Sequence, residues 1–268
     1  QLNINPNKLL GQNFLIDRNI SKKIISVSEL SKDDILLEIG PGLGAITEDL
    51  AKKVKKVYAV EIDYRLCSYL KKRLMKYNNV EIINKDVLDT KIPFHNKVVS
   101  NIPYTITGPI LEKIFFKEKS PMGILTIEKS IADRIFLTQK YKDLSRISIG
   151  VNTFMTPILK SDISNISFYP APKIAISLIK IAPKESIDPF LLKEKSKNYY
   201  LKFIAGIMPY KNKNIVNALH FFFKTLRKNP QFTKKEILTI LHQNTYKNKK
   251  VFNFKIEEFV ELSKLFYS

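Results

Sequence analysis

Short apolar runs alternate with helical periodicity through the first half of the chain. A run of apolar residues bounded by turn residues predicts a buried strand, and apolar residues three to four positions apart predict one face of a helix. Strands regularly separated by helices are typical of an α/β fold with a parallel sheet. We expect strands at 35–39, 57–60, 80–83, 97–100 and 122–127, and helices along Ile46, Leu50 and Val54, along Leu66, Tyr69, Leu70 and Leu74, and over 107–116.

The pattern changes after residue 127. Residues 130–136 look helical, 151–159 are predicted as a strand, and Ile174, Ile176 and Leu178 alternate with other residues as in a half-buried strand. The segment 183–189, bounded by prolines, is the best domain boundary. We therefore expect a first domain over 1–182, with an N-terminal arm at 1–20 that packs over a pocket, and a small domain over 183–268.

The last third of the chain shows helical periodicity throughout. Its apolar residues repeat at helical spacing, and basic residues stand between them. The apolar stripes are Tyr200, Phe203, Ile204 and Ile207; Ile215, Val216, Leu219 and Phe222; Ile237, Ile240 and Leu241; and Phe259, Leu262 and Phe266. The basic residues include Lys211, Lys213, Arg227, Lys228, Lys234, Lys235, Lys247, Lys249 and Lys250.

A glycine-rich turn follows the first predicted strand. Gly40-Pro41-Gly42-Leu43-Gly44 lets the backbone turn sharply and come close to a ligand. Glu61 ends the second strand, where a carboxylate can accept both ribose hydroxyls. Asp86 follows the third strand and can accept the exocyclic amine of an adenine. No P-loop sequence for a polyphosphate accompanies them. Together these residues predict S-adenosylmethionine as the ligand.

The fourth predicted strand leads into Asn101-Ile102-Pro103-Tyr104. In isolation this tetrapeptide is an ordinary turn. At the carboxyl edge of a doubly wound sheet, the Asn101 side-chain oxygen and a main-chain carbonyl at 102 or 103 can hold the amine of a flipped-out adenine. Pro103 fixes the backbone, and Tyr104 can stack on the base. If the loop at 168–173 borders the site, Phe168 covers the other face of the base and Lys173 meets a phosphate.

The net charge of the chain predicts a further binding partner. The chain has 45 Lys and Arg against 25 Asp and Glu, a net charge of +20, which favours a polyanionic partner over mere solvation of the surface. Residues 181–268 hold 17 basic and 7 acidic residues, so this part is the more basic per residue and is a candidate RNA-binding domain. One cysteine argues against disulfides and cysteine-based zinc sites, and we expect no metal. With no spanning segment or signal core evident, a cytoplasmic monomer without membrane contact is expected.

The motifs resemble those of the ribosomal RNA adenine N6,N6-dimethyltransferases, which include the KsgA type and the Erm resistance type. The resemblance runs over nearly the whole chain. It is carried in order and spacing by Gly-Gln-Asn-Phe-Leu from Gly11, Glu-Ile-Gly-Pro-Gly-Leu-Gly from Glu38, Val-Glu-Ile-Asp from Val60, Asn-Ile-Pro-Tyr from Asn101 and Phe-x-Pro-x-Pro-Lys from Phe168.

The resemblance implies a Rossmann-like class I methyltransferase domain with a small C-terminal α-helical domain, and a site for each substrate. Donor contacts are implied at Gln12, Asn13, Leu15, Gly40, Gly42, Glu61, Ile62, Asp86 and Asn101. Target-base contacts are implied at Asn101, Tyr104 and Phe168, with Pro103 shaping the clamp. The N-terminal arm becomes part of the cofactor pocket.

Within the family, Leu10–Leu15 and Thr107-Gly108-Pro109-Ile110 look more like the KsgA type, which dimethylates two adjacent adenosines near the 3′ end of small-subunit rRNA. The resemblance thus implies that substrate, a pre-30S-type particle as partner, and a role in small-subunit biogenesis. An Erm-type enzyme, a DNA amino-methyltransferase and a non-catalytic ribosome-assembly or RNA-binding factor are the alternatives. Where relatives tend to have an Arg-rich segment, this chain has Met208-Pro209-Tyr210-Lys211-Asn212-Lys213, and lysine lacks the bidentate guanidinium fork.

Overall fold

The computed structural model describes residues 5–137, 144–226, 232–242, 246 and 249–267. The first residues of the predicted arm, 1–4, lie outside the described part, as do the predicted basic residues Arg227, Lys228 and Lys247. No helix in the described part is long and apolar enough to cross a membrane.

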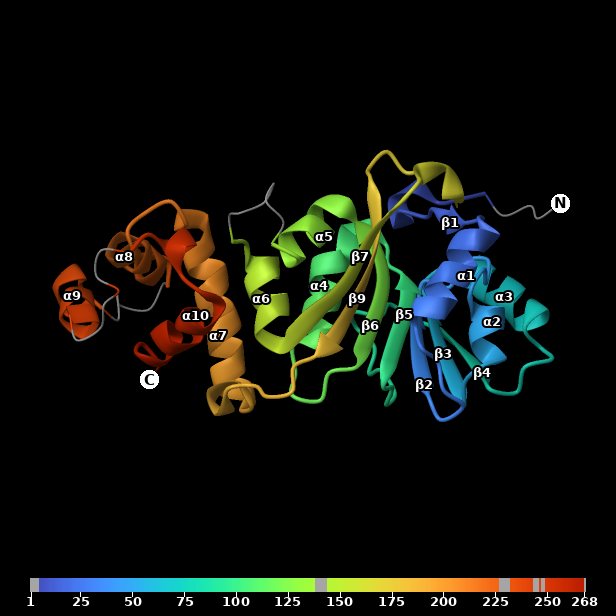
Figure 1. The fold of residues 1–268 in the computed structure, drawn as a ribbon, viewed down its shortest axis with the longest axis horizontal. Helices are drawn as coiled ribbons and strands as arrows, with labels where there is room; N and C mark the ends of the chain where they lie inside the picture. Colours follow the sequence, from blue (N-terminus) through green and yellow to red (C-terminus); the bar gives the residue numbers. More distant parts are fainter. Residues whose placement is uncertain (1–4, 138–143, 227–231, 243–245, 247–248, 268) are drawn as a thin grey trace.

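A seven-stranded sheet in the order β4-β3-β2-β5-β6-β9-β7 forms the centre of the described structure (Figure 1). Strands β2 to β6 are parallel to one another, and β9 runs antiparallel to both β6 and β7. The chain order reverses direction between β2 and β5, which leaves a crevice at their carboxyl ends. The strands are β2 (Ile35–Ile39), β3 (Lys56–Glu61), β4 (Val80–Asn84), β5 (Lys97–Asn101), β6 (Met122–Glu128), β7 (Met155–Ile163) and β9 (Ile176–Pro183).

The sheet is covered by helices on both faces. Leu36, Val57 and Val99 belong to a core cluster with α1 and α2, while their neighbours Leu37 and Val98 belong to a cluster with α4, α5 and α6. Successive side chains of a strand point to opposite faces, so a strand buried on both faces is apolar throughout. The helices are α1 (Arg18–Val27), α2 (Thr47–Ala51), α3 (Tyr64–Arg73), α4 (Thr107–Phe115), α5 (Lys129–Ile135) and α6 (Arg146–Phe154).

The chain continues after β9 as a helical segment at one end of the molecule (Figure 1). Its packing against the sheet domain is seen at the Thr153 hydroxyl of α6, which lies 2.8 Å from the Tyr200 hydroxyl of α7, and the Tyr200 side chain is completely buried. The predicted helical stripes belong to the core cluster, with Ile240 partly buried against it. This segment contains α7 (Glu194–Ile207), α8 (Ile215–Thr225), α9 (Lys234–His242) and α10 (Ile256–Lys264).

The structure confirms the predicted α/β fold class and corrects two of its elements. Residues 151–159, predicted as a strand, contain the end of α6 and the start of β7. Ser145 caps α6 by accepting from the Ser148 backbone N–H, and this capping box starts the helix through an apolar run whose period is ambiguous. The strand expected around Ile174–Leu178 to be half-buried is instead buried on both faces, because side chains of β9 pack in both core clusters.

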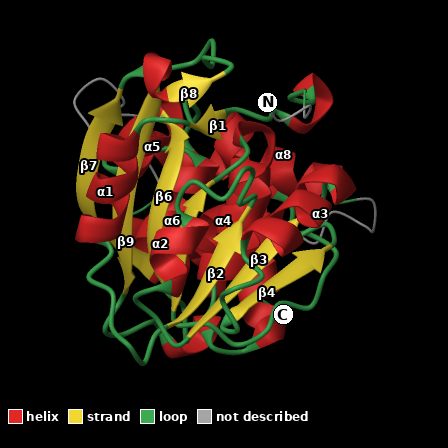
Figure 2. Cartoon of the chain, turned by 90° about the vertical axis from the view of Figure 1, so that its right-hand side faces the viewer, coloured by secondary structure: helices red, strands yellow, loops and turns green. Residues whose placement is uncertain are grey.

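The N-terminal arm lies at the carboxyl end of the sheet. The short strands β1 (Phe14–Leu15) and β8 (Phe168–Tyr169) pair antiparallel there, with Leu15 opposite Phe168. Figure 2 shows them at the end of the sheet toward which the arrow of β2 points. The last residues of the predicted arm belong to α1, which Asp17 caps by accepting from the Asn19 and Ile20 backbone N–H groups. The arm is therefore tied to a loop near residue 168.

Candidate functional site: a pocket at the carboxyl ends of β2, β3 and β5

A pocket of about 280 Å³ opens at the point where the strand order reverses. The ends of β2, β3 and β5 line it, and so do the N-terminal arm and the loop after β4. Of the predicted site residues, every one except Phe168 lines this pocket: Gln12, Asn13, Leu15, Gly40, Gly42, Glu61, Ile62, Asp86, Asn101, Pro103 and Tyr104.

The glycine turn needs its glycines for conformation and for space. Gly40, Gly42 and Gly44 have φ values of 64, 58 and 75°, in the left-handed region that residues with a Cβ rarely adopt. A Cβ on Gly42 would lie 2.9 Å from the Phe14 ring of the arm, which is too close. The turn is thus shaped both to face a ligand and to receive the arm.

Two buried carboxyl groups stand beside the glycine turn. Glu61, at the end of β3, accepts from the Asp63 backbone N–H at 2.9 Å and from the Gly42 backbone N–H at 3.4 Å. Burial raises the pKa of Glu61. Glu38, at 1 % exposure on β2, also lines the pocket, and its Oε2 has no hydrogen-bond partner in the described structure. Burial, together with the smaller effect of the nearby Glu61, raises the pKa of Glu38 to about 8.

The charged lining favours a cationic adenosine derivative over a polyphosphate. Among the described lining residues, Glu61 and Asp86 are acidic beside Glu38, whose raised pKa keeps it protonated at neutral pH, and Lys85 is the one basic residue, although the chain as a whole is strongly basic. Asp86 is held by the Leu88 backbone N–H, which donates to its Oδ1 at 2.8 Å. S-adenosylmethionine carries a sulfonium and an ammonium group, so these residues fit it as a ligand.

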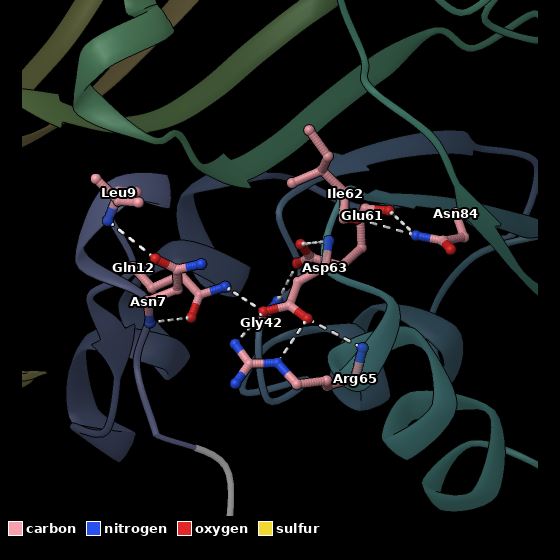
Figure 3. A network of polar contacts seen from close by, with 9 residues as sticks. All are labelled: Asn7, Leu9, Gln12, Gly42, Glu61, Ile62, Asp63, Arg65 and Asn84. Atoms are coloured by element: carbon pink, nitrogen blue, oxygen red, sulfur yellow. Dashed lines mark hydrogen bonds and ion pairs between the residues drawn. The ribbon is translucent and has the colours of Figure 1, made fainter.

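A polar network ties the arm to Glu61, the carboxylate predicted to bind ribose (Figure 3). The Gln12 side-chain amide donates to Asp63 Oδ2 at 2.9 Å, and its oxygen accepts from the Asn7 backbone N–H at 2.7 Å. Arg65 donates to both Asp63 oxygens, and this guanidinium lowers the pKa of Asp63 to about 2. Because the Asp63 backbone N–H also donates to Glu61, one residue positions both the arm and the carboxylate.

Asn101 is held at both ends of its side-chain amide. Its Nδ2 donates to the Asn13 carbonyl of the arm at 3.0 Å, and its Oδ1 accepts from the Thr126 hydroxyl of β6. Pro103 faces the glycine turn, since a Cβ on Gly40 would lie 3.7 Å from its ring. These contacts bring the predicted amine clamp directly beside the predicted donor turn.

The two predicted stacking residues differ in accessibility. Tyr104 lines the pocket, and burial raises the pKa of its hydroxyl, which has no hydrogen-bond partner in the described structure. Phe168 is 2 % exposed and packs in the core cluster that also contains Leu15 and contacts Tyr104. Its ring is not in the pocket lining, so its contact with a base stays a prediction. Lys173 is exposed in the loop after β8.

Glu38, Thr126 and Asp63 were not predicted from the sequence as residues of the site. Glu38 and Thr126 are polar residues inside otherwise apolar strands, a signal that is visible in the sequence but has many other causes. Asp63 directly follows Glu61 and Ile62, and its role depends on a contact with Gln12 that no local pattern predicts.

This fold and pocket define a Rossmann-like class I methyltransferase that uses S-adenosylmethionine. The family model described as "Ribosomal RNA adenine dimethylase" matches residues 3–255, and the chain belongs to this family. It is thus an S-adenosylmethionine-dependent rRNA adenine dimethyltransferase, as its motifs predicted.

Individual relatives agree with the family. The chain is 34% identical over 260 residues, 97% of this chain and 92% of the other, to the "Probable ribosomal RNA small subunit methyltransferase A" of Thermococcus sibiricus. Its fold is similar to that of a dimethyladenosine transferase from Plasmodium falciparum, with a TM-score of 0.77, 28% identity and coverage of 93% and 95%. It is also similar to the 23S rRNA methyltransferase ErmE, with a TM-score of 0.66, 25% identity and coverage of 94% and 99%.

Proposed function

We propose that this chain N6,N6-dimethylates two adjacent adenosines near the 3′ end of small-subunit rRNA and so contributes to small-subunit biogenesis. The observation that carries the proposal is the place of Asn101 and Tyr104, which line one pocket together with the glycine turn, Glu61 and Asp86. The relative from Thermococcus sibiricus, which matches nearly the whole chain, is named for the small subunit, and this supports the choice of substrate.

The clamp has to orient a weak nucleophile. The exocyclic amine of adenine is conjugated with its ring, so its lone pair must be turned toward the methyl group. The Asn101 Oδ1 and the main-chain carbonyl at 102 or 103 accept the two amine N–H bonds, and Tyr104 stacks on the flipped-out base. Stacking of this kind contributes about 1–3 kcal/mol. Phe168 covers the other face of the base after its ring moves out of the core.

The donor half of the pocket supplies position and charge. S-adenosylmethionine supplies an electrophilic methyl group on a sulfonium. Glu61 accepts from the ribose hydroxyls and Asp86 from the adenine amine, while Gln12, Asn13 and Leu15 close the arm over the pocket. No strong general base is needed, because the methylated amine loses its proton to solvent.

The helical segment over 183–268 acts as the RNA-binding domain in this proposal, and 1–182 as the catalytic domain. The described surface of the helical segment carries basic side chains beside aromatic rings. The Lys213 Nζ lies 5.4 Å from the centre of the Phe221 ring, and the Lys250 Nζ lies 5.8 Å from the centre of the Phe252 ring. Tyr210 stacks on Phe221 at 5.1 Å. Lysines can contact the phosphates and rings can contact the bases of an RNA. The protein acts as a monomer in the cytoplasm on a small-subunit particle.

The test is to offer small and large ribosomal subunits without N6-dimethyl marks to the purified protein with labelled donor. We expect label in small-subunit rRNA, and mass mapping should find N6,N6-dimethyladenosine at two adjacent positions near its 3′ end. Label in the large subunit alone would contradict the proposal and favour an Erm-type enzyme. RNA binding without methyl transfer would favour a non-catalytic assembly factor.

A further inference from the structure

Thr126 places a buried hydroxyl in an apolar strand. Its neighbours Ile124, Leu125 and Ile127 in β6 are completely buried, and Thr126 itself is 1 % exposed. Valine has nearly the same shape and no polar atom, so packing alone does not call for a threonine here. A hydroxyl removed from water is costly unless it is hydrogen-bonded, and the partner of this hydroxyl is therefore informative.

The partner is the amide that holds the target amine in the proposed function. Thr126 lies directly opposite Asn101 in the pairing of β5 with β6, and its hydroxyl donates to Asn101 Oδ1. The Thr126 carbonyl also accepts from the Ile102 backbone N–H at 3.1 Å. Thr126 therefore contacts both the side chain and the following backbone of the clamp from the protein interior.

The two contacts of the Asn101 amide allow one orientation. Its Nδ2 faces the Asn13 carbonyl at 3.0 Å, and a reversed amide would bring two acceptor oxygens together there. In the observed orientation Oδ1 has two lone pairs. The Thr126 hydroxyl occupies one of them, which leaves the other for an incoming N–H.

From this geometry we infer that Thr126 is a positioning residue for methyl transfer, which acts by holding the Asn101 oxygen where the target amine must donate. The inference rests on the proposed role of Asn101. Thr126 does not line the pocket, so it acts through Asn101 and not on the substrates directly. Without the hydroxyl, the arm contact at Asn13 still orients the amide, but one end of it is no longer held.

The experiment compares Thr126→Val, which removes the hydroxyl at nearly constant shape, with Thr126→Ser, which keeps it. We expect Thr126→Val to lower kcat for methyl transfer about tenfold, because this factor corresponds to the free energy of one hydrogen bond. The KM for the donor and the Kd for RNA should stay within about twofold, and Thr126→Ser should restore most of kcat. In an Asn101→Ala background, Thr126→Val should have little further effect, because both changes act on one group.

A second readout does not depend on activity. In protein labelled with ¹⁵N at asparagine, the side-chain NH₂ signal that disappears in Asn101→Ala should shift in Thr126→Val and return in Thr126→Ser. An unchanged signal or an unchanged kcat in a folded Thr126→Val protein would overturn the inference, and so would an undiminished effect in the Asn101→Ala background. If the wild-type protein methylates no small-subunit rRNA, the proposed function fails while this signal still decides the link between Thr126 and Asn101.

Discussion

At the residue scale, the chemistry of the pocket depends on a few side chains whose surroundings change their properties. Asn101 is suited to the proposed clamp because both ends of its amide are held, and Glu38 is unusual because it is a carboxyl group buried without a partner for Oε2 in the described structure. Each of these side chains leads to a prediction.

Asn101→Ala should separate methyl transfer from RNA binding. The change removes an interaction made at the reacting amine, so we expect kcat to fall about 100-fold or more while the Kd for RNA changes less than about twofold. Single-turnover methylation and filter binding measure the two quantities. Asn78→Ala, at an exposed position before β4, is the matched control and should leave both unchanged. Equal losses in transfer and binding would contradict the role of Asn101.

Glu38→Gln should change how stability depends on pH in the absence of ligand. Burial raises the pKa of Glu38 from 4.5 to about 8, so the folded protein binds its proton more tightly than the unfolded chain does. The associated stability is fully present below pH 4.5 and is lost as the pH rises to about 8. Relative to Glu38→Gln, the free energy of unfolding of the wild type should fall by up to about 1.4 kcal/mol per pH unit in this window.

Urea unfolding at a series of pH values measures that difference. Glu118→Gln, at an exposed position, is the matched control and should follow the wild type. Parallel profiles for the wild type and Glu38→Gln would show that the Glu38 carboxyl is not perturbed.

At the scale of elements, the arm and the sheet are joined by a few polar contacts. The arm meets the carboxyl end of β3 through Gln12 and Asp63, and it meets β8 through the pairing of Leu15 with Phe168. The neighbouring strand β6 contacts the proposed clamp through the Thr126 hydroxyl, which donates to Asn101. The arm therefore lines the pocket, and a substitution in the arm can weaken its attachment without changing a residue of the sheet.

Gln12→Glu should release the arm. Asp63 is ionised at neutral pH, since Arg65 lowers its pKa to about 2, so a second carboxylate at position 12 repels it. We expect faster amide hydrogen exchange at residues 7–15. Donor binding should be about tenfold weaker, because this factor corresponds to the free energy of a hydrogen bond to a charged group. Gln12→Met removes the bond without adding charge and should give an intermediate result. Unchanged exchange in Gln12→Glu would exclude this attachment.

The alternation of strands and helices up to residue 128 could be predicted because each element has a clear period of its own. The glycine turn, Glu61, Asp86 and Asn101 could be predicted for the same reason, since each directly follows one of these strands. The start of β7 could not be predicted, because the apolar run across 151–159 fits both the helical and the strand period. The Ser145 cap decides between them. The burial of β9 follows from the core clusters that cover its two faces, which no local pattern reveals.

At the scale of the whole molecule, a strongly basic chain surrounds an acidic pocket. The net charge of +20 is suited to attracting RNA, while the carboxyl groups of Glu61 and Asp86 in the pocket lining suit a cationic donor. In the proposed function, affinity for RNA and recognition of the donor are carried by different parts of the surface.

RNA binding should weaken steeply with salt. If the protein neutralises several phosphates, counterion release predicts a loss of about a thousandfold in affinity between roughly 50 and 200 mM salt. Lys211→Glu with Lys213→Glu should weaken binding and flatten this slope. Lys71→Glu with Lys72→Glu on α3, an equal charge change outside the helical segment, should have a smaller effect. Titrations of a small-subunit rRNA fragment measure the slope, and a flat response would leave the charge without this role.

The sequence by itself determined the elements up to residue 128, the turn chemistry and most of the residues that meet at the pocket, because these depend on neighbours in the chain and on the common direction of parallel strands. Only the tertiary structure decided how those residues are held. Gln12 meets Asp63, Asn101 meets Thr126, and Phe168 is buried against Leu15 because the fold brings distant segments together. The raised pKa of Glu38 likewise comes from exclusion of water, which is a property of the packed molecule and not of the residue.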